Sequence, residues 1–169
     1  ETAAEADLII AWGANLATTN VHFLPVIEAA RRRGARFVVI DPYRTRTARR
    51  ADWHLAPRLG TDAALALGMM HVLVREGLLD RAYIAARTVG FERLCAETLP
   101  HYPQDGVAAI AGIAAADVER LARLYGRARA PFIRLGMGMS RHAGGGMAVR
   151  AVACLPALVG AWRKPGGGA

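Results

Sequence analysis

Lysine is nearly absent from this chain: all of its 22 basic residues except Lys164 are arginines. Aromatic residues are also few (7%), and they are scattered, unlike the interleaved pattern of nucleic-acid-binding modules. No apolar run reaches the roughly 18 residues that a membrane span needs. We therefore expect no nucleic-acid partner and no membrane span. The net charge of +8 favours phosphate-bearing ligands, although codon bias explains an arginine excess equally well.

Cysteine is scarce as well, which excludes several kinds of site. Cys95 and Cys154 lie far apart and form no C-x-x-C pair, so we expect neither a disulfide framework nor clustered zinc or iron–sulfur ligands, but two small buried apolar residues. The chain also lacks G-x-G-x-x-G, Walker A and G-x-S-x-G motifs. His22, His71 and His142 show no metal-ligand spacing. We therefore predict no catalytic residue and no metal ligand within this chain.

Apolar runs alternate with helical patterns along the 169 residues, which are 53% hydrophobic. Strands are predicted over 7–13, 35–41, 53–59 and 130–138, and helices over 21–33, 62–76, 80–87, 91–98, 113–128 and 144–162. Residues 99–112 contain prolines and are predicted to be an irregular connector. This order predicts an α/β fold: a single Rossmann-like, three-layer domain over residues 1–169 with a mostly parallel sheet.

Unusual residues follow the predicted strands, where parallel sheets bind their ligands. They are Gly13-Ala14-Asn15, Asp41-Pro42, Gly60-Thr61-Asp62 and Gly136-Met137-Gly138. A single glycine after the first strand lets a backbone approach a phosphate, but it also suits an ordinary tight turn.

The segment FVVIDPYRTRTARRAD (37–52) suggests a nucleotide site. Asp41 ends a buried strand and can accept hydrogen bonds from ribose hydroxyls, with Arg44 and Arg46 close to phosphates. Asp62 can accept from the N1 and N2 donors of guanine, which adenine lacks. A turn at Asp41 and a helix cap at Thr61 or Asp62 are the alternatives.

Four motifs in this order resemble the molybdopterin oxidoreductase family, which includes dimethyl sulfoxide reductase, formate dehydrogenase and periplasmic nitrate reductase. They are WGAN (12–15), DPYRTRTARRAD (41–52), LGTD (59–62) and GMGMSRHAGGG (136–146), the last followed by a helix and PGGG. The resemblance covers nearly the whole chain. The sequence departs from the family pattern at Tyr43, where the family has Arg, at Leu59, where Pro is usual, and at Arg141, where Gln is frequent.

The resemblance implies a cofactor: molybdenum or tungsten held between two molybdopterin guanine dinucleotides, for oxygen-atom transfer or related two-electron chemistry. This chain would be one of the two guanine-dinucleotide-binding domains. The absent initiator Met and the final glycine run suggest an internal segment. The metal ligand and an iron–sulfur cluster site would lie upstream, and the remaining domains and electron-transfer subunits would be its partners. The segment alone is expected to be inactive.

The family motifs also assign expected contacts. Trp12, Gly13, Asn15 and Thr18 would line the pyrophosphate and pterin; Asp41, Pro42, Arg44 and Thr45 the ribose and phosphates; Gly60, Thr61 and Asp62 the guanine; and Gly136, Met137, Gly138 and Arg141 the pterin near the metal pocket.

Two other readings of the α/β pattern stay open on the residues alone. One is an adenine-nucleotide-binding domain like the middle domain of thiamine-diphosphate enzymes. The other is a flavodoxin-like interaction domain that uses its basic face. Guanine selectivity would separate the first of these from the family reading.

Overall fold

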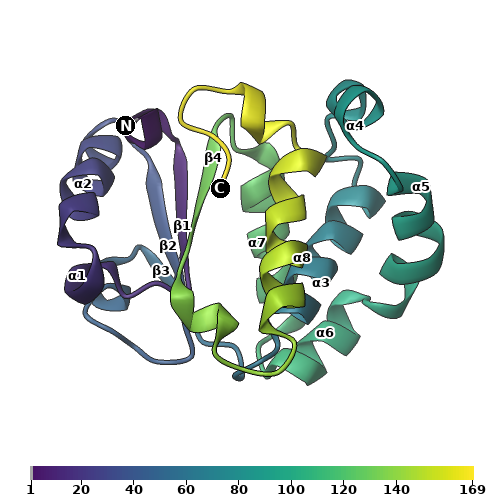
Figure 1. Cartoon of the computed structure of the whole chain (residues 1–169), viewed down its shortest axis with the longest axis horizontal. Coiled ribbons are helices and arrows are strands. Elements are labelled where there is room, and N and C mark those ends of the chain that lie inside the picture. Colours follow the sequence, from purple (N-terminus) through teal and green to yellow (C-terminus); the bar gives the residue numbers. More distant parts are fainter. Residues whose placement is uncertain (1) are drawn as a thin grey trace.

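A parallel sheet lies between two unequal layers of helices in the computed structural model, which describes residues 2–169 (Figure 1). The strands are β1 (Leu8–Trp12), β2 (Arg36–Ile40), β3 (Trp53–Leu55) and β4 (Pro131–Leu135). They pair in the order β3-β2-β1-β4, and every pair is parallel. The predicted α/β class with a parallel sheet is confirmed.

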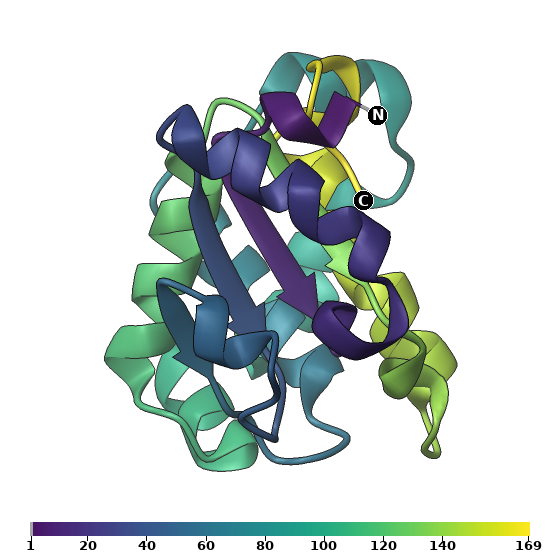
Figure 2. The same cartoon turned by 90° about the vertical axis from the view of Figure 1, so that its left-hand side faces the viewer.

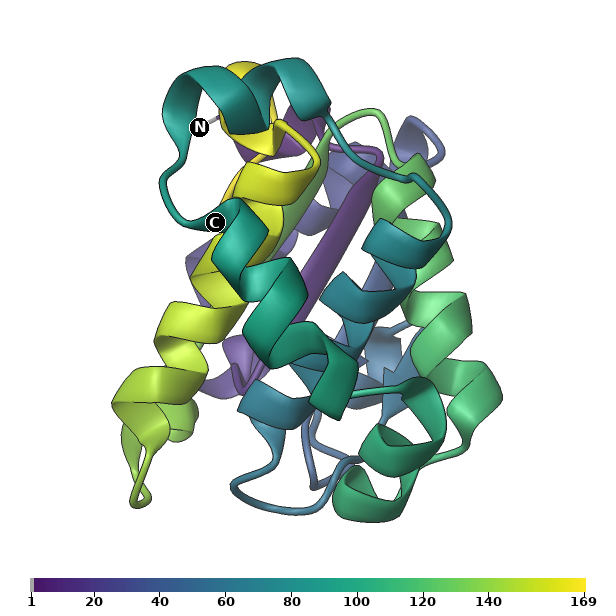
Figure 3. The same ribbon diagram turned by 90° about the vertical axis from the view of Figure 1, so that its right-hand side faces the viewer.

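The helices divide between the two faces of the sheet. They are α1 (Leu16–Thr19), α2 (Leu24–Arg32), α3 (Asp62–Arg75), α4 (Arg81–Arg87), α5 (Phe91–Arg93), α6 (Gln104–Ala111), α7 (Ala115–Arg127) and α8 (Gly145–Leu158). A π-helical turn (94–98) continues α5, and single 3-10 turns occupy 2–5, 21–23, 48–50, 99–101, 137–140 and 161–163. Helices α1 and α2 cover one face (Figure 2), whereas α3, α7 and α8 cover the other, with α5 and α6 outside them (Figure 3).

Burial on both faces explains the continuous apolar strands. Along β1, Leu8, Ile10 and Trp12 pack beneath α3, α7 and α8, and the alternate residues Ile9 and Ala11 pack beneath α2. All five are at most 1% exposed. Since successive side chains point to opposite faces, such a strand has no polar side and must be central. The observed position of β1 between β2 and β4 agrees with this.

The predicted irregular connector over 99–112 is largely wrong, because Gln104–Ala111 form helix α6. The helix begins after Pro103, whose backbone is extended, and ends before Gly112. Its residue Val107 is fully buried against Gly68 of α3, where a Cβ would lie 2.8 Å from the valine side chain. This tertiary contact stabilises a short helix whose composition alone predicts a loop.

Two smaller expectations also fail. Cys154 is exposed and Cys95 is half-buried, so neither is the buried thiol that was predicted. At the start of α3, Thr61 does not cap the helix, because its hydroxyl donates to the Arg58 carbonyl oxygen at 2.6 Å, and the Asp62 carboxylate turns towards Trp12. No helix among residues 2–169 is long and apolar enough to cross a membrane.

The two ends of the described chain meet at the amino ends of the strands. The Asp7 carboxylate, just before β1, accepts hydrogen bonds from the amides of Arg129 and Ala130, just before β4. Gly168 pairs with Phe132 at the start of β4. The opposite, carboxyl edge of the sheet is therefore free of both ends.

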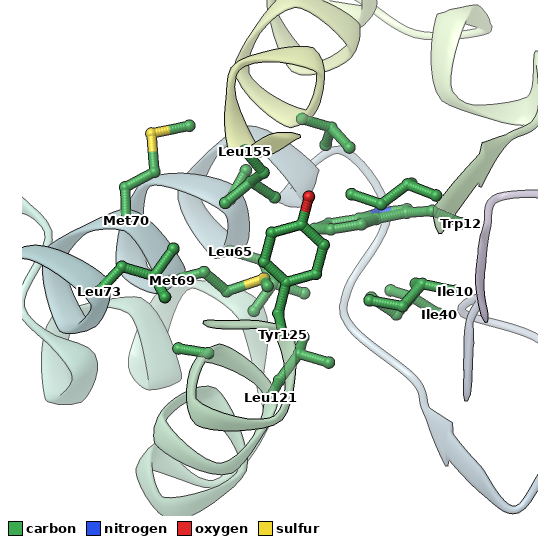
Figure 4. Packing of buried hydrophobic residues seen from close by; sticks show 14 of the residues in the cluster. Ile10, Trp12, Ile40, Leu65, Met69, Met70, Leu73, Leu121, Tyr125 and Leu155 are labelled. Atoms are coloured by element: carbon green, nitrogen blue, oxygen red, sulfur yellow. The ribbon is translucent and has the colours of Figure 1, made fainter. Parts of the chain in front are cut away.

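A tyrosine hydroxyl is buried in the core between the sheet and α3, α7 and α8 (Figure 4), with no hydrogen-bond partner among residues 2–169. Tyr125 is 0% exposed, and this burial raises the pKa of its hydroxyl well above the usual value. Tyr125→Phe should raise the free energy of unfolding by about 1 kcal/mol, because it removes an unsatisfied polar group. Tyr125→Ala should lower it by about 3–5 kcal/mol. Urea denaturation tests both, and a loss of stability in the phenylalanine variant would contradict the assignment.

An ion-pair network fastens the end of α3 to α7. The Arg123 guanidinium bonds the Glu76 carboxylate at 2.8 and 2.9 Å, Arg75 bonds it at 3.0 Å, and Glu119 bonds both arginines. Arg123 and then Arg75 lower the pKa of Glu76 from 4.5 to about 2.

A carboxyl whose pKa is lowered on folding stabilises the fold above its unfolded pKa and loses that effect as the pH falls through the folded value. Glu76→Gln should therefore lower the thermal midpoint at pH 7 by roughly 2 °C. The difference from wild type should close between pH 4.5 and pH 2. Thermal melts followed by circular dichroism across this range test it, and a difference that stays constant with pH would contradict the role of Glu76.

Candidate nucleotide-binding site

The chain reverses its direction across the sheet between β1 and β4. After β1 it enters α1 and α2 on one face, and after β4 it enters α8 on the other. Adjacent parallel strands whose connections leave to opposite faces open a crevice at their carboxyl ends, which is where such sheets bind ligands. The loops predicted to carry the site all lie at this edge.

Two hollows lie side by side at this edge. The larger, of about 820 Å³, lies between the segments that leave β1 and β4. The smaller, of about 130 Å³, lies between the segment that leaves β2 and the start of α3. Gly13, Asp41 and Gly138 line both, so the two hollows adjoin each other at these residues. Pockets for whole drug-sized ligands measure about 300–1,000 Å³, so the smaller one suits a single ring system.

The loop after β1 is held in place by the loop after β2. The Thr47 hydroxyl, which is buried, accepts a hydrogen bond from the Ala17 amide and donates one to Asn15 Oδ1, both at 2.9 Å. Gly13 has a φ of +59°, a conformation that side chains rarely adopt. The backbone after β1 is thereby fixed along the wall of the larger hollow.

Asp41 lies at the junction of the two hollows and is anchored by β3. Its amide donates to the Leu55 carbonyl at 3.0 Å, and the His54 ring donates to the Asp41 carbonyl at 2.8 Å. One carboxylate oxygen accepts from the Tyr43 amide at 2.9 Å. Burial raises the pKa of this carboxyl, an effect that the Tyr43 amide and His54 oppose. A half-buried carboxylate with free acceptor positions at a junction can bind hydroxyl groups.

Asp62 joins the start of α3 to the core. Its Oδ1 accepts a hydrogen bond from the Trp12 indole at 2.7 Å, and its Oδ2 lies 3.8 Å from His142 Nε2. Trp12 is fully buried and does not line either hollow; it fixes the orientation of Asp62 from beneath. The Asp62 carboxylate thus lines the smaller hollow with one oxygen already bonded.

The loops after β1 and β4 touch through their backbones. A Cβ on Gly136 would lie 1.9 Å from the Gly13 carbonyl oxygen and 2.6 Å from Ala14 Cα. The Gly136 amide donates to the Trp12 carbonyl at 2.9 Å, which extends the pairing of β1 and β4. No side chain fits between these segments, so the floor of the crevice has a fixed width.

The structure brings most, but not all, of the expected residues to these hollows. Lining positions are taken by Gly13, Asn15, Asp41, Pro42, Gly60, Asp62, Gly136, Met137 and Gly138. Thr18, Arg44 and Arg141 are exposed and line neither hollow, and Thr61 lines neither. The Thr45 hydroxyl is buried and accepts from the Ala48 amide at 3.1 Å, so it stabilises the turn.

Several lining residues escape prediction from the sequence. Arg134, on β4, lines the larger hollow with Thr19, Asn20 and Ser140, and its guanidinium donates to the Leu135 carbonyl at 2.7 Å. In the sequence, Arg134 is a charged residue in an otherwise apolar strand. This pattern singles it out but does not indicate what it binds. His142 and Arg58 border the smaller hollow. Among residues 2–169, no three His, Cys, Asp or Glu side chains gather as a metal site.

Comparison with known proteins gives a consistent result. The sequence model of the molybdopterin oxidoreductase family matches residues 1–169. The chain is 44% identical to the probable oxidoreductase YoaE of Bacillus subtilis, over all of this chain and 25% of that protein. It is 35% identical to formate dehydrogenase H of Escherichia coli, over 96% of this chain and 22% of the relative.

A solved structure is similar as well. Acetylene hydratase from Pelobacter acetylenicus superposes with a TM-score of 0.86 at 35% identity, over 92% of this chain and 22% of that one. The chain therefore spans a quarter or less of the length of these relatives.

Proposed function

This chain belongs to the molybdopterin oxidoreductase family, and we propose that it is the part of a longer enzyme that binds the guanosine and pyrophosphate of one molybdopterin guanine dinucleotide. The family implies a molybdenum or tungsten pterin cofactor, which supplies the redox chemistry when it is bound. The residues of this chain hold and orient it. We assign none of them a catalytic role.

The observation that carries the proposal is the order of groups along the two hollows. The smaller hollow, with Asp62, suits the base, Asp41 at the junction suits the ribose hydroxyls, and the larger hollow suits the pyrophosphate and pterin. Base, ribose and phosphate follow one another in the same order in a nucleotide. A flat base in the small hollow would place its sugar against Asp41 without rearrangement of the chain.

The larger hollow has the polarity that a pyrophosphate requires. Its lining offers the Arg134 guanidinium and the side-chain amides of Asn15 and Asn20, and Asp41 is the one carboxylate among the described lining residues. Arginine binds phosphate oxygens through paired N–H groups. Arg44 and Arg46, the cations expected from the sequence, are exposed and line neither hollow. We therefore assign the phosphate contact to Arg134.

Asp41→Asn should separate affinity from stability. The amide keeps an acceptor for the Tyr43 amide but binds ribose hydroxyls without a charge, so GDP affinity should fall by about 10- to 100-fold. Because burial raises the pKa of Asp41, its ionised form lowers stability as the pH rises above 3.8, and the neutral variant should be at least as stable at pH 7.

Calorimetric titration and thermal melts measure the two effects of this change. 2′,3′-Dideoxy-GDP is the control ligand and should bind wild type and variant alike. An unchanged GDP affinity in the variant would contradict the ribose contact.

The proposed function is tested on the full-length protein, purified from cells that cannot make the pterin cofactor. We expect GDP to bind at least about 10-fold more tightly than ADP, and Asp62→Ala to abolish the preference. Asp105→Ala is the matched control, since Asp105 lies on α6 away from both hollows. Equal or tighter binding of ADP would overturn the proposal in favour of an adenine-nucleotide domain.

A further inference from the structure

The smaller hollow contains a carboxylate with one oxygen already engaged. A carboxylate that reads guanine unaided needs both oxygens, one for N1–H and one for the amino group. Here the Trp12 indole donates to Asp62 Oδ1 at 2.7 Å, and Asp62 is 15% exposed. Oδ2 is left for a ligand, and an acceptor on a neighbouring residue can take the second donor of the base.

His142 offers that acceptor. Its Nδ1 lies 2.8 Å from the Ala143 carbonyl, which can only accept, so in the neutral ring Nδ1 carries the hydrogen and Nε2 has a free lone pair. Nε2 is shielded from solvent and has no hydrogen-bond partner among the described residues. It lies 3.8 Å from Asp62 Oδ2, beyond direct hydrogen-bond distance.

Asp62 and His142 both line this small hollow, and their acceptor atoms, 3.8 Å apart, require donors between them. A buried acceptor without a partner is costly, and two beside each other repel. Guanine presents adjacent donors, N1–H and the exocyclic amino group, on one edge. Adenine has an acceptor at N1, and hypoxanthine has the N1–H but lacks the amino group.

The walls of the hollow suit a flat ring. Pro42, Pro57 and Leu59 supply apolar surface, and the His142 ring lies against Gly60. Gly60 has a φ of +78°, and a Cβ there would lie 3.6 Å from His142 Nδ1. A side chain at this position would occupy the space beside the imidazole.

We infer that His142 is a specificity-determining residue for the base: Nε2 accepts from the amino group of guanine while Asp62 Oδ2 accepts from N1–H. This inference rests on the proposed function and assigns the two donors of guanine to two different residues. Asp62 distinguishes guanine and hypoxanthine from adenine, and His142 distinguishes guanine from hypoxanthine.

The test compares GDP, IDP and ADP as ligands of the same cofactor-free, full-length protein. Wild type should bind GDP about 10-fold more tightly than IDP, the effect of one hydrogen bond to a buried acceptor. His142→Phe should bind GDP and IDP equally, with IDP affinity within about twofold of wild type. His142→Gln, which has an acceptor oxygen, should restore part of the preference. His101→Phe, on an exposed 3-10 turn, should behave as wild type.

The outcomes separate the two proposals. If wild type prefers GDP to ADP but not to IDP, or if His142→Phe keeps the wild-type ratio of GDP to IDP, the role of His142 is overturned and the guanine site stands. If wild type does not prefer GDP to ADP, the proposed function fails and the inference with it. Thermal melts check that each variant is folded, and if the phenylalanine variant is not, the ratio measured for His142→Ala takes its place.

Discussion

Gly136→Ala is expected to lower the free energy of unfolding by about 3 kcal/mol or more and to weaken GDP binding by about 100-fold. The new methyl group would lie 1.9 Å from the Gly13 carbonyl oxygen and 2.4 Å from the carbonyl carbon. Both are backbone atoms, so no side-chain rotation relieves the overlap. The loops after β1 and β4 must move apart, and the crevice between them must change its width.

The matched control is Gly146→Ala. Gly146 lies in α8, and an added Cβ meets nothing within 4 Å. This change should raise stability by up to about 1 kcal/mol through helix propensity. Urea denaturation and calorimetric titration of both variants make the comparison. A Gly136→Ala protein as stable as wild type would show that the two loops are not held at the distance described.

Trp12→Phe is expected to lower the free energy of unfolding by about 2–4 kcal/mol and to weaken the selection of the base. The indole is fully buried, so the smaller ring leaves a cavity. The Asp62 carboxylate also loses the donor that holds Oδ1, and a buried acceptor without a partner costs about 1–3 kcal/mol. With its orientation no longer fixed, Asp62 should select less well between GDP and ADP.

A double-mutant cycle with Asp62→Ala, which removes the acceptor of the indole, isolates the hydrogen bond from the packing. We expect a coupling of about 1–2 kcal/mol between the two positions. Trp162→Phe serves as the control, because Trp162 is 48% exposed, and it should cost about 1 kcal/mol or less. Additive effects of Trp12→Phe and Asp62→Ala would contradict a bond that positions the carboxylate.

The strands and the main helices are predictable from the sequence because buried elements consist of apolar residues in recognisable runs and periods. The apolar runs at β1 and β2 have no polar face, and Asp41 marks the end of the second. The helix α6 is not predictable in this way, since it depends on Val107 meeting Gly68, a contact between residues 39 positions apart. Packing partners that distant leave no local periodicity.

The residues of the candidate site also fall into those that the sequence indicates and those that only the fold brings together. Glycines and acids that follow strands are visible in the sequence, and they line the hollows because parallel strands end at one edge. The arginine cluster after Asp41 misleads, because charge alone does not tell which guanidinium faces inward. Arg134 and His142 reach the hollows from segments distant in the chain, and only the fold reveals that His142 and Asp62 are neighbours.

The meeting of both chain ends at the amino edge of the sheet has a mechanical consequence. The parts of the chain before β1 and after β4 come together near Ala6 and Gly168, so this edge of the sheet is where further segments would attach. The carboxyl edge, with the two hollows, lies one strand length away, about 16 Å for five residues. A tilt of the domain by about 5° about its amino edge would therefore move the hollows by roughly 1.4 Å. Displacements of this size change how well a bound group is aligned. Stiffness at that edge, far from any contact with the nucleotide, would therefore set how accurately the group is held.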